Sequence, residues 1–570
     1  MRPIAVVAAL CAACPAERVD DGTADASASV VTPSAPSASS APTASSAPTA
    51  SRAASAAPRL EPGSVLACAL SRASGDPTAS FDRAIARARA EGLQDPAALL
   101  ASVHDTKDEV GRRFLALETL ARHLADAGRF LEVERLAAAP FADWRATYLD
   151  GVCATAATRA GGVEVGSRIA DGIGDEHTRA RVFLDLAALA PSEAAALIGR
   201  AVVALRSARP RKAHVPWRDG RMWVAEHSEA LAMLVECARG YGALGRSEEA
   251  LLLLSDVRAL GRQHHYLEDV PGFAAAVKLE AAFGRAVRGD GQGARELARE
   301  ALEAPRAGRD IEGRARLLLR GAELARVLSD GGEDLLREAL ETARTLEQAE
   351  LQEWRVRGAR GTMIPIADAW VTSGNRGEAA RVLELAERTI LSATKLTLPG
   401  GAEDRARALV AVGTAHARAG DLGRARALVA DAVGALLRGS DPCSAEFPGM
   451  AIMDLLLGAD FREQALAAAD TMASCPSAAD RAYGRIVDAT PAAGDAIAIA
   501  ARIRDRAGRL AALVRAANRD PAGAEALMAA ALELASPGSP TELLLVANAY
   551  VDAPVVAEGA VAAALRRHCH

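Results

Sequence analysis

The stretch ARGYGALGRSEEALLLLSDV, residues 238–257, decides the fold of this chain. Small or apolar residues stand at helical spacing on both sides of one glycine: Ala238, Tyr241, Gly245, Ala250, Leu254 and Val257. Residues three or four positions apart share one face of a helix, and glycine readily adopts the left-handed backbone that ends a helix. The stretch therefore predicts two helices joined by a tight turn at Gly245.

The same pattern returns in residues 367–386 and 413–432, where the six positions keep identical spacing. Further turns of this kind stand near Gly128, Gly162, Gly289, Gly331 and Ala459. Most are roughly 40 residues apart, and such a period marks an array in which each hairpin buries its apolar face against its neighbours. The gap between Gly162 and Gly245 is wide enough for one more hairpin, which we expect near residues 187–206.

The composition agrees with an all-α array. Half of the 570 residues are apolar but only 3% are aromatic, so the core must be built largely from Ala, Leu and Val. Alanine has the highest helix propensity, and no long run of β-branched residues argues for a sheet.

These repeats resemble the tetratricopeptide repeat, a family of helical hairpins. The resemblance implies a right-handed superhelical solenoid of stacked antiparallel hairpins, which we expect over residues 64–535, with capping helices in 536–570. HEAT-like repeats are the alternative, because their period is also near 40 residues.

The first residues resemble a bacterial lipoprotein signal. Met1-Arg2 precedes an apolar run that ends Leu10-Cys11-Ala12-Ala13-Cys14, in which a cysteine follows two small residues. The resemblance implies a signal peptide at 1–14, lipidation of Cys14, and an exported, membrane-anchored protein that faces the periplasm or the cell surface; plain secretion is the alternative. Residues 15–63 are rich in Ala, Ser, Thr and Pro, which predicts a disordered tether.

The family resemblance implies a non-catalytic scaffold that binds a peptide or protein partner on one face of the array, in the cell envelope. We expect the partner to meet outward positions of the first helices, at Glu236, Arg239, Arg357, Asp368 and Arg418. A net charge of −6 gives no general attraction to nucleic acid, so no nucleic-acid partner is expected. The membrane is expected only as the site of the lipid anchor.

Two loops and two cysteines leave other interpretations open. Loops 207–222 and 261–273 interrupt the repeats, and a pocket between them would make the chain an enzyme or an enzyme's regulatory subunit; a purely structural spacer is a third possibility. No catalytic, cofactor-binding or metal-binding motif is recognised, so none of these sites is predicted. Cys443 and Cys475 flank one hairpin at the same end, which an exported protein could join in a disulfide.

Overall fold

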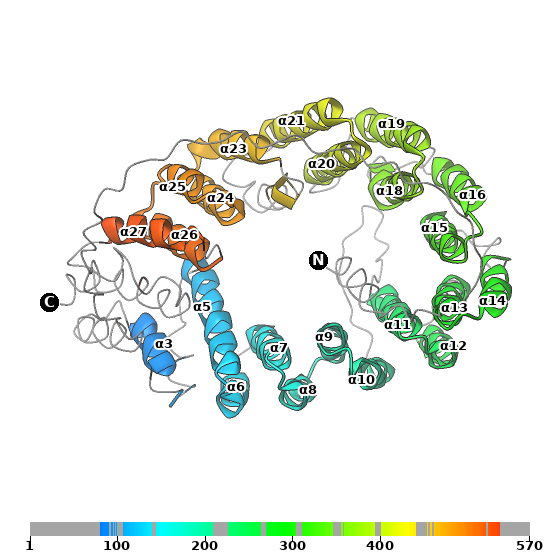
Figure 1. The fold of residues 1–570 in the computed structure, drawn as a ribbon, viewed down its shortest axis with the longest axis horizontal. Helices are drawn as coiled ribbons and strands as arrows, with labels where there is room; N and C mark the ends of the chain where they lie inside the picture. The colour runs from blue at the N-terminus through cyan, green and yellow to red at the C-terminus, as the bar shows by residue number, and fades with distance from the viewer. Residues whose placement is uncertain are drawn as a thin grey trace, which may run out of the picture. The chain divides into compact units, whose positions relative to one another are not determined.

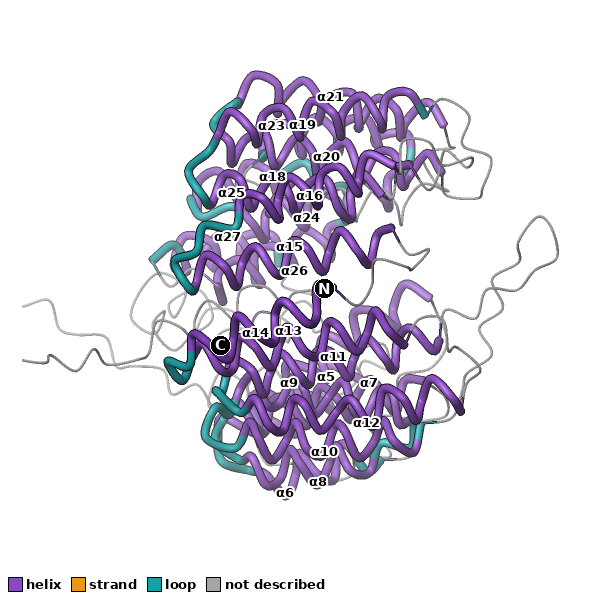
Figure 2. The backbone as a smooth tube through the Cα atoms, turned by 90° about the vertical axis from the view of Figure 1, so that its right-hand side faces the viewer, coloured by secondary structure: helices purple, strands orange, loops and turns teal. Residues whose placement is uncertain are grey.

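The computed structural model describes residues 80–90, 93–94, 96, 99, 107–139, 144–208, 226–263, 270–303, 311–345, 355–356, 358–393, 401–439, 453, 456–458, 461–519, 522–535 and 546. Within these ranges the regular structure is helical throughout, and no strand is present. Figure 2 shows these helices in purple and the described loops between them in teal.

Most helices pair as hairpins, with a first and a second helix. The first hairpins are α5 (Lys107–Asp126) with α6 (Phe130–Ala137), α7 (Trp144–Arg159) with α8 (Val163–Gly172), α9 (Glu176–Leu189) with α10 (Ala194–Ser207), α11 (Glu226–Ala243) with α12 (Ser247–Gln263), and α13 (Val270–Val287) with α14 (Gly291–Glu303). The later ones are α15 (Ile311–Val327) with α16 (Glu333–Arg344), α18 (Ile364–Thr372) with α19 (Arg376–Ser392), α20 (Gly401–Ala419) with α21 (Leu422–Gly439), α24 (Pro476–Ala489) with α25 (Ala493–Ala500), and α26 (Arg506–Arg519) with α27 (Ala524–Leu534). Helix α3 (Ser80–Ala90) precedes them, a π-helical turn (Ala359–Met363) leads into α18, and α23 (Arg462–Thr471) followed by a 3₁₀ turn (Met472–Ser474) leads into α24.

Glycine and an Asx residue together make the turn between two helices. Gly374 and Gly420 have φ angles of 84° and 98°, the left-handed conformation predicted for a helix end. The N–H of the next residue then bonds back to the first helix, from Asn375 to the Trp370 carbonyl at 3.0 Å. The Asn375 side chain in turn accepts the Glu378 N–H at 3.1 Å and so caps the second helix.

Consecutive hairpins stack in two layers (Figure 1). The first helices of many neighbouring hairpins lie side by side, as α5, α7 and α9 do and as α11, α13 and α15 do, and we call this the first-helix layer. Each second helix packs against its own first helix and often against the next one, as α12 does against α11 and α13. The seam between layers is rich in alanine, with Ala238, Ala250 and Ala379 among the fully buried residues.

Small residues let neighbouring first helices approach closely. A Cβ at Gly242 of α11 would lie 2.3 Å from the backbone oxygen of Glu280 in α13. The buried residues form two main clusters, and α15 contributes Leu317 to one and Leu318 to the other. The core is therefore partitioned at α15.

The predicted fold is confirmed as an all-helical array of stacked hairpins, including one hairpin, α9–α10, near the position expected between Gly162 and Gly245. The turn expected near Gly162 is present: Gly161 has the left-handed backbone, with φ of 91°, and Gly162 is the N-cap of α8. The proposed signal 1–14, the tether 15–63 and the closing segment 536–570 lie outside the described residues, apart from Val546.

Among the described residues, none of the helices combines the length and apolarity that a membrane span requires.

Candidate functional site

The residues predicted to meet a partner form ion pairs that join neighbouring first helices. Asp368 of α18 accepts a hydrogen bond from Arg418 of α20 at 2.7 Å. Glu236 of α11 is paired with Arg181 of α9, and both side chains are partly exposed. With Arg239, described next, four of the five predicted residues form ion pairs between first helices. The fifth, Arg357, lies outside the described residues.

Arg239, the remaining predicted residue, belongs to a network across three first helices. It reaches Glu280 of α13 at 3.2 Å, and Arg320 of α15 binds the same carboxylate through two hydrogen bonds of 2.9 and 2.6 Å. The Arg320 guanidinium also lies 3.6 Å from the ring centre of Phe283. Only 2% of the Glu280 side chain is exposed, so the two arginines compensate a buried charge and fix the spacing of α11, α13 and α15.

A groove lies in the first-helix layer. It has a volume of about 270 Å³ and crosses α5, α7 and α9; we call it the first-helix groove. Its lining is Glu118, Arg122, Thr147, Tyr148, Gly151, Val152, Thr155, Ala156, Arg159, Thr178, Val182 and Asp185.

The floor of the first-helix groove is low because α7 carries small residues there. Gly151 stands opposite Val182 of α9, whose Cγ2 would lie 3.3 Å from an added Cβ. Thr155, one turn further along, turns its hydroxyl inward and donates to the Gly151 carbonyl at 2.7 Å. Tyr148, which also lines the groove, has 47% of its surface exposed. The groove therefore combines a hollow floor with an exposed aromatic side chain.

The charges of this groove are only partly neutralised. Glu118 and Arg122 pair with each other at 2.8 Å along α5. Arg159 and Asp185, by contrast, have neither an ion pair nor a hydrogen bond within the part of the chain that the structure describes. Burial raises the pKa of Asp185, while Arg181 opposes the shift and Glu236 adds to it. Burial and the nearby Glu118 also raise the pKa of Tyr148 above its usual value.

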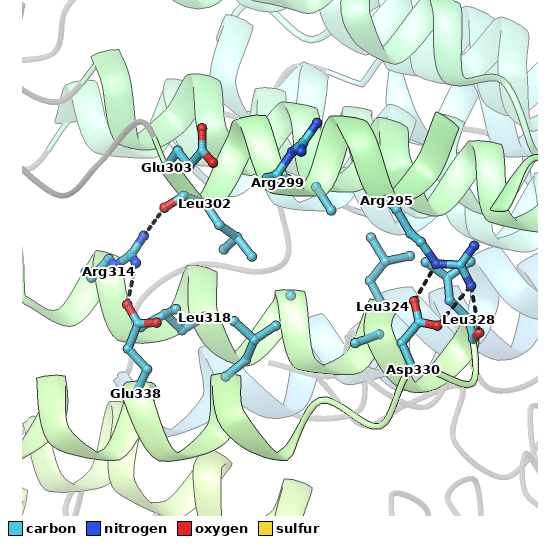
Figure 3. Close-up of a pocket in the computed structure, with 14 residues that line it drawn as sticks. Arg295, Arg299, Leu302, Glu303, Arg314, Leu318, Leu324, Leu328, Asp330 and Glu338 are labelled. Carbon is cyan, nitrogen blue, oxygen red and sulfur yellow. Dashed lines mark hydrogen bonds and ion pairs between the residues drawn. The ribbon is translucent and has the colours of Figure 1, made fainter. Parts of the chain in front are cut away.

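A second cavity, of about 310 Å³, lies between α14, α15 and α16 (Figure 3). We call it the leucine groove, because leucines from all three helices line it. Neither cavity is lined by the interrupting loops: most of 207–222 and 261–273, with His214, His264 and His265, lies outside the described residues.

Neither described free thiol is suited to nucleophilic chemistry. Cys153 and Cys237 are buried. Burial raises the pKa of the Cys237 thiol to about 12, and it raises that of Cys153 as well. Among the described residues, no cluster of three or more His, Cys, Asp or Glu side chains is arranged to hold a metal ion. Cys475 is disulfide-bonded. Its predicted partner, Cys443, lies outside the described residues, so that pairing stays a prediction.

Sequence reasoning missed the first-helix groove because its repeat was recognised only weakly. One signal was available: Gly151, Thr155 and Arg159 are four residues apart, so they share one face of α7. On that face small residues would lie beside Tyr148, and a tyrosine at such a place stands out because only 3% of the chain is aromatic.

Comparison with known proteins gives structural neighbours only. No known protein family and no curated protein matches this sequence. Solved structures similar to it include Ton1535 from Thermococcus onnurineus NA1 (14% identity, TM-score 0.22, covering 62% of this chain and 95% of that one). Yeast Tom70 is another (12% identity, TM-score 0.25, 85% and 95%), as is a circular tandem repeat protein with novel repeat topology and enhanced subunit contact surfaces (15% identity, TM-score 0.18, 89% and 98%). At such scores the fold assignment rests on the helices themselves.

Proposed function

We propose that this chain is a non-catalytic scaffold that holds a segment of a partner protein in the first-helix groove. The observation that carries the proposal is a hollow across three neighbouring first helices, with an exposed tyrosine and two charged residues, Arg159 and Asp185, that form no ion pair among the described residues. Tyrosine and arginine are over-represented among the side chains that dominate binding at protein interfaces. A peptide with charges of both signs would satisfy Arg159 and Asp185 together.

The first part of the test asks whether this groove selects a peptide. A random peptide library displayed on phage is selected against the purified full-length chain, and an enriched peptide becomes the probe. Tyr148→Ala removes an exposed ring without disturbing the core, and we expect it to weaken binding by about tenfold, the loss typical of a central aromatic. Gly151→Leu fills the floor and should have at least as large an effect.

The matched control is a charge on the other layer. Arg159→Glu should weaken the probe several-fold, whereas Arg135→Glu on α6 should not, since Arg135 is exposed but lies outside the groove. Enriched peptides that bind wild type, Tyr148→Ala and Gly151→Leu equally well would refute the groove as the binding site.

The proposed location is the bacterial cell envelope, with the array held on the membrane by lipidated Cys14. The support for this part is the sequence Leu10-Cys11-Ala12-Ala13-Cys14 and the Ala/Ser/Thr/Pro-rich tether after it. Replacing Cys14 by Ala should move the protein from the membrane fraction to the soluble fraction. Unchanged fractionation would show that Cys14 carries no anchor.

A further inference from the structure

The leucine groove is a short apolar slot in which both ends are closed (Figure 3). At its base lie Leu318 and Leu324 of α15, which are 0% and 1% exposed, while Leu302 of α14 and Leu335 of α16 are only partly buried. One end is closed by the ion pair between Arg295 and Asp330, with an Nε–Oδ2 distance of 2.6 Å.

The other end of the slot is closed by Arg314. Its guanidinium donates to Glu338 and to the carbonyl of Leu302, both at 2.6 Å. Along α14 the two ends are seven residues apart, from Arg295 to Leu302, which is about 10 Å at 1.5 Å per residue. The slot thus has room for roughly two helical turns.

Two charged residues on the rim have no partner among the residues that the structure describes. Arg299 and Glu303 stand one turn apart on α14, and both are exposed. Within the described ranges neither forms an ion pair or hydrogen bond, whereas Arg295 and Arg314 in the same lining are fully engaged. An occupant that complements this rim carries one acidic and one basic group at the spacing of one turn, above apolar side chains.

The chemistry of the slot selects a helix over an extended peptide. Leucine side chains offer no partners to backbone N–H and C=O groups, and leaving these groups unpaired in an apolar site is costly. A helix satisfies its own backbone and presents side chains three and four residues apart on one face. The resident helices give its direction, because α15 packs antiparallel to α14 in this slot.

We propose that the leucine groove docks an amphipathic helix of a partner protein, antiparallel to α14. Leucine-sized side chains of the helix enter the slot, a basic residue faces Glu303, and an acidic residue four positions later faces Arg299. The groove shares no residue with the first-helix groove, so this site stands or falls independently of the function proposed above.

The test uses two synthetic helical peptides of identical composition, labelled with fluorescein. Both carry leucines on one face; one has Lys-x-x-x-Glu at the flanking positions and the other Glu-x-x-x-Lys. Anisotropy titrations with the full-length chain should show that the Lys-x-x-x-Glu peptide binds about tenfold more tightly, the combined effect of two attractive pairs replaced by two repulsive ones.

Variants assign the binding to this groove. Exchanging the rim charges, Arg299→Glu with Glu303→Arg, changes only exposed side chains and should reverse the preference between the peptides. Ala298→Phe fills the slot and should weaken both peptides, while Arg135→Glu on α6 should leave both unchanged. Neither the charge exchange nor Ala298→Phe should alter binding of the probe selected for the first-helix groove.

Three outcomes would overturn the proposal. They are failure of both peptides to bind the wild-type chain, a preference that the charge exchange does not reverse, and self-association of the chain that Ala298→Phe abolishes in sedimentation velocity. The last result would assign the groove to a second copy of this chain instead of a partner helix.

Discussion

Replacing Gly242 by Ala should loosen the array at one defined seam. The added Cβ would lie 2.3 Å from the Glu280 backbone oxygen, whereas ordinary contacts begin at 3.4 Å. Because a backbone oxygen cannot rotate away, α11 and α13 must separate by about 1 Å, and such overpacking costs typically 1–3 kcal/mol. Alanine regains about 0.5–1 kcal/mol of helix propensity over glycine. The expected net loss is about 1 kcal/mol.

Two other glycines make this a graded series. At Gly413 an added Cβ would lie 3.1 Å from the Ala425 oxygen, and at Gly494 of α25 it would meet nothing within 4 Å. Gly413→Ala should therefore cost less than Gly242→Ala, and Gly494→Ala should be neutral or slightly stabilising. Each variant is compared with wild type by urea unfolding, followed by far-UV circular dichroism.

Hydrogen exchange locates the effect, since repeat arrays can unfold in parts. We expect Gly242→Ala to speed exchange in α11 and α13 while α26 and α27 keep the wild-type rate. If Gly242→Ala and Gly494→Ala have the same unfolding midpoint, the inference that first helices depend on glycine for close approach is refuted.

Three further results are expected. Gly420→Ala should cost about 1–2 kcal/mol because φ is 98° there, and an unchanged urea midpoint would contradict the role of this residue as a helix terminator. Burial raises the pKa of the half-buried Asp150 to about 6. The folded state therefore holds the Asp150 proton more tightly than the unfolded state does. The stability that this carboxyl contributes below its unfolded pKa is lost as pH rises through 6. Asp150→Asn should therefore stabilise the chain by about 1 kcal/mol at about pH 8 and by less at about pH 4, and equal shifts of the urea midpoint at both pH values would contradict this. A non-reduced proteolytic digest should contain one peptide pair joined through Cys443 and Cys475 in mass spectrometry; a different partner for Cys475 would show that the predicted pairing is wrong.

Local signals were the part of the fold that the sequence could predict. Gly245, Gly374 and Gly420 have the left-handed backbone expected from their spacing, and Trp370 is 1% exposed as its inward repeat position requires. The turn between α9 and α10 was placed only from the length of the gap, because Pro191 and its neighbours carry no glycine there.

The candidate sites depended on contacts that no sequence pattern specifies. Arg418 was correctly placed on a first helix, but its bond to Asp368, fifty residues earlier, follows from how α18 and α20 stack. The leucine groove likewise exists because α14, α15 and α16 leave a gap between side chains. A helical periodicity cannot distinguish such a gap from a filled core.

The succession of hairpins also has a consequence for biosynthesis. Helix α7 finds its packing partners in α5, α6, α8 and α9, all of them within a short stretch of the chain. Contacts of such short sequence separation form quickly, because each partner of α7 leaves the ribosome shortly before or shortly after α7 itself. Each new hairpin can therefore cover the apolar face of the one before it during synthesis, which shortens the time for which that surface is open to aggregation.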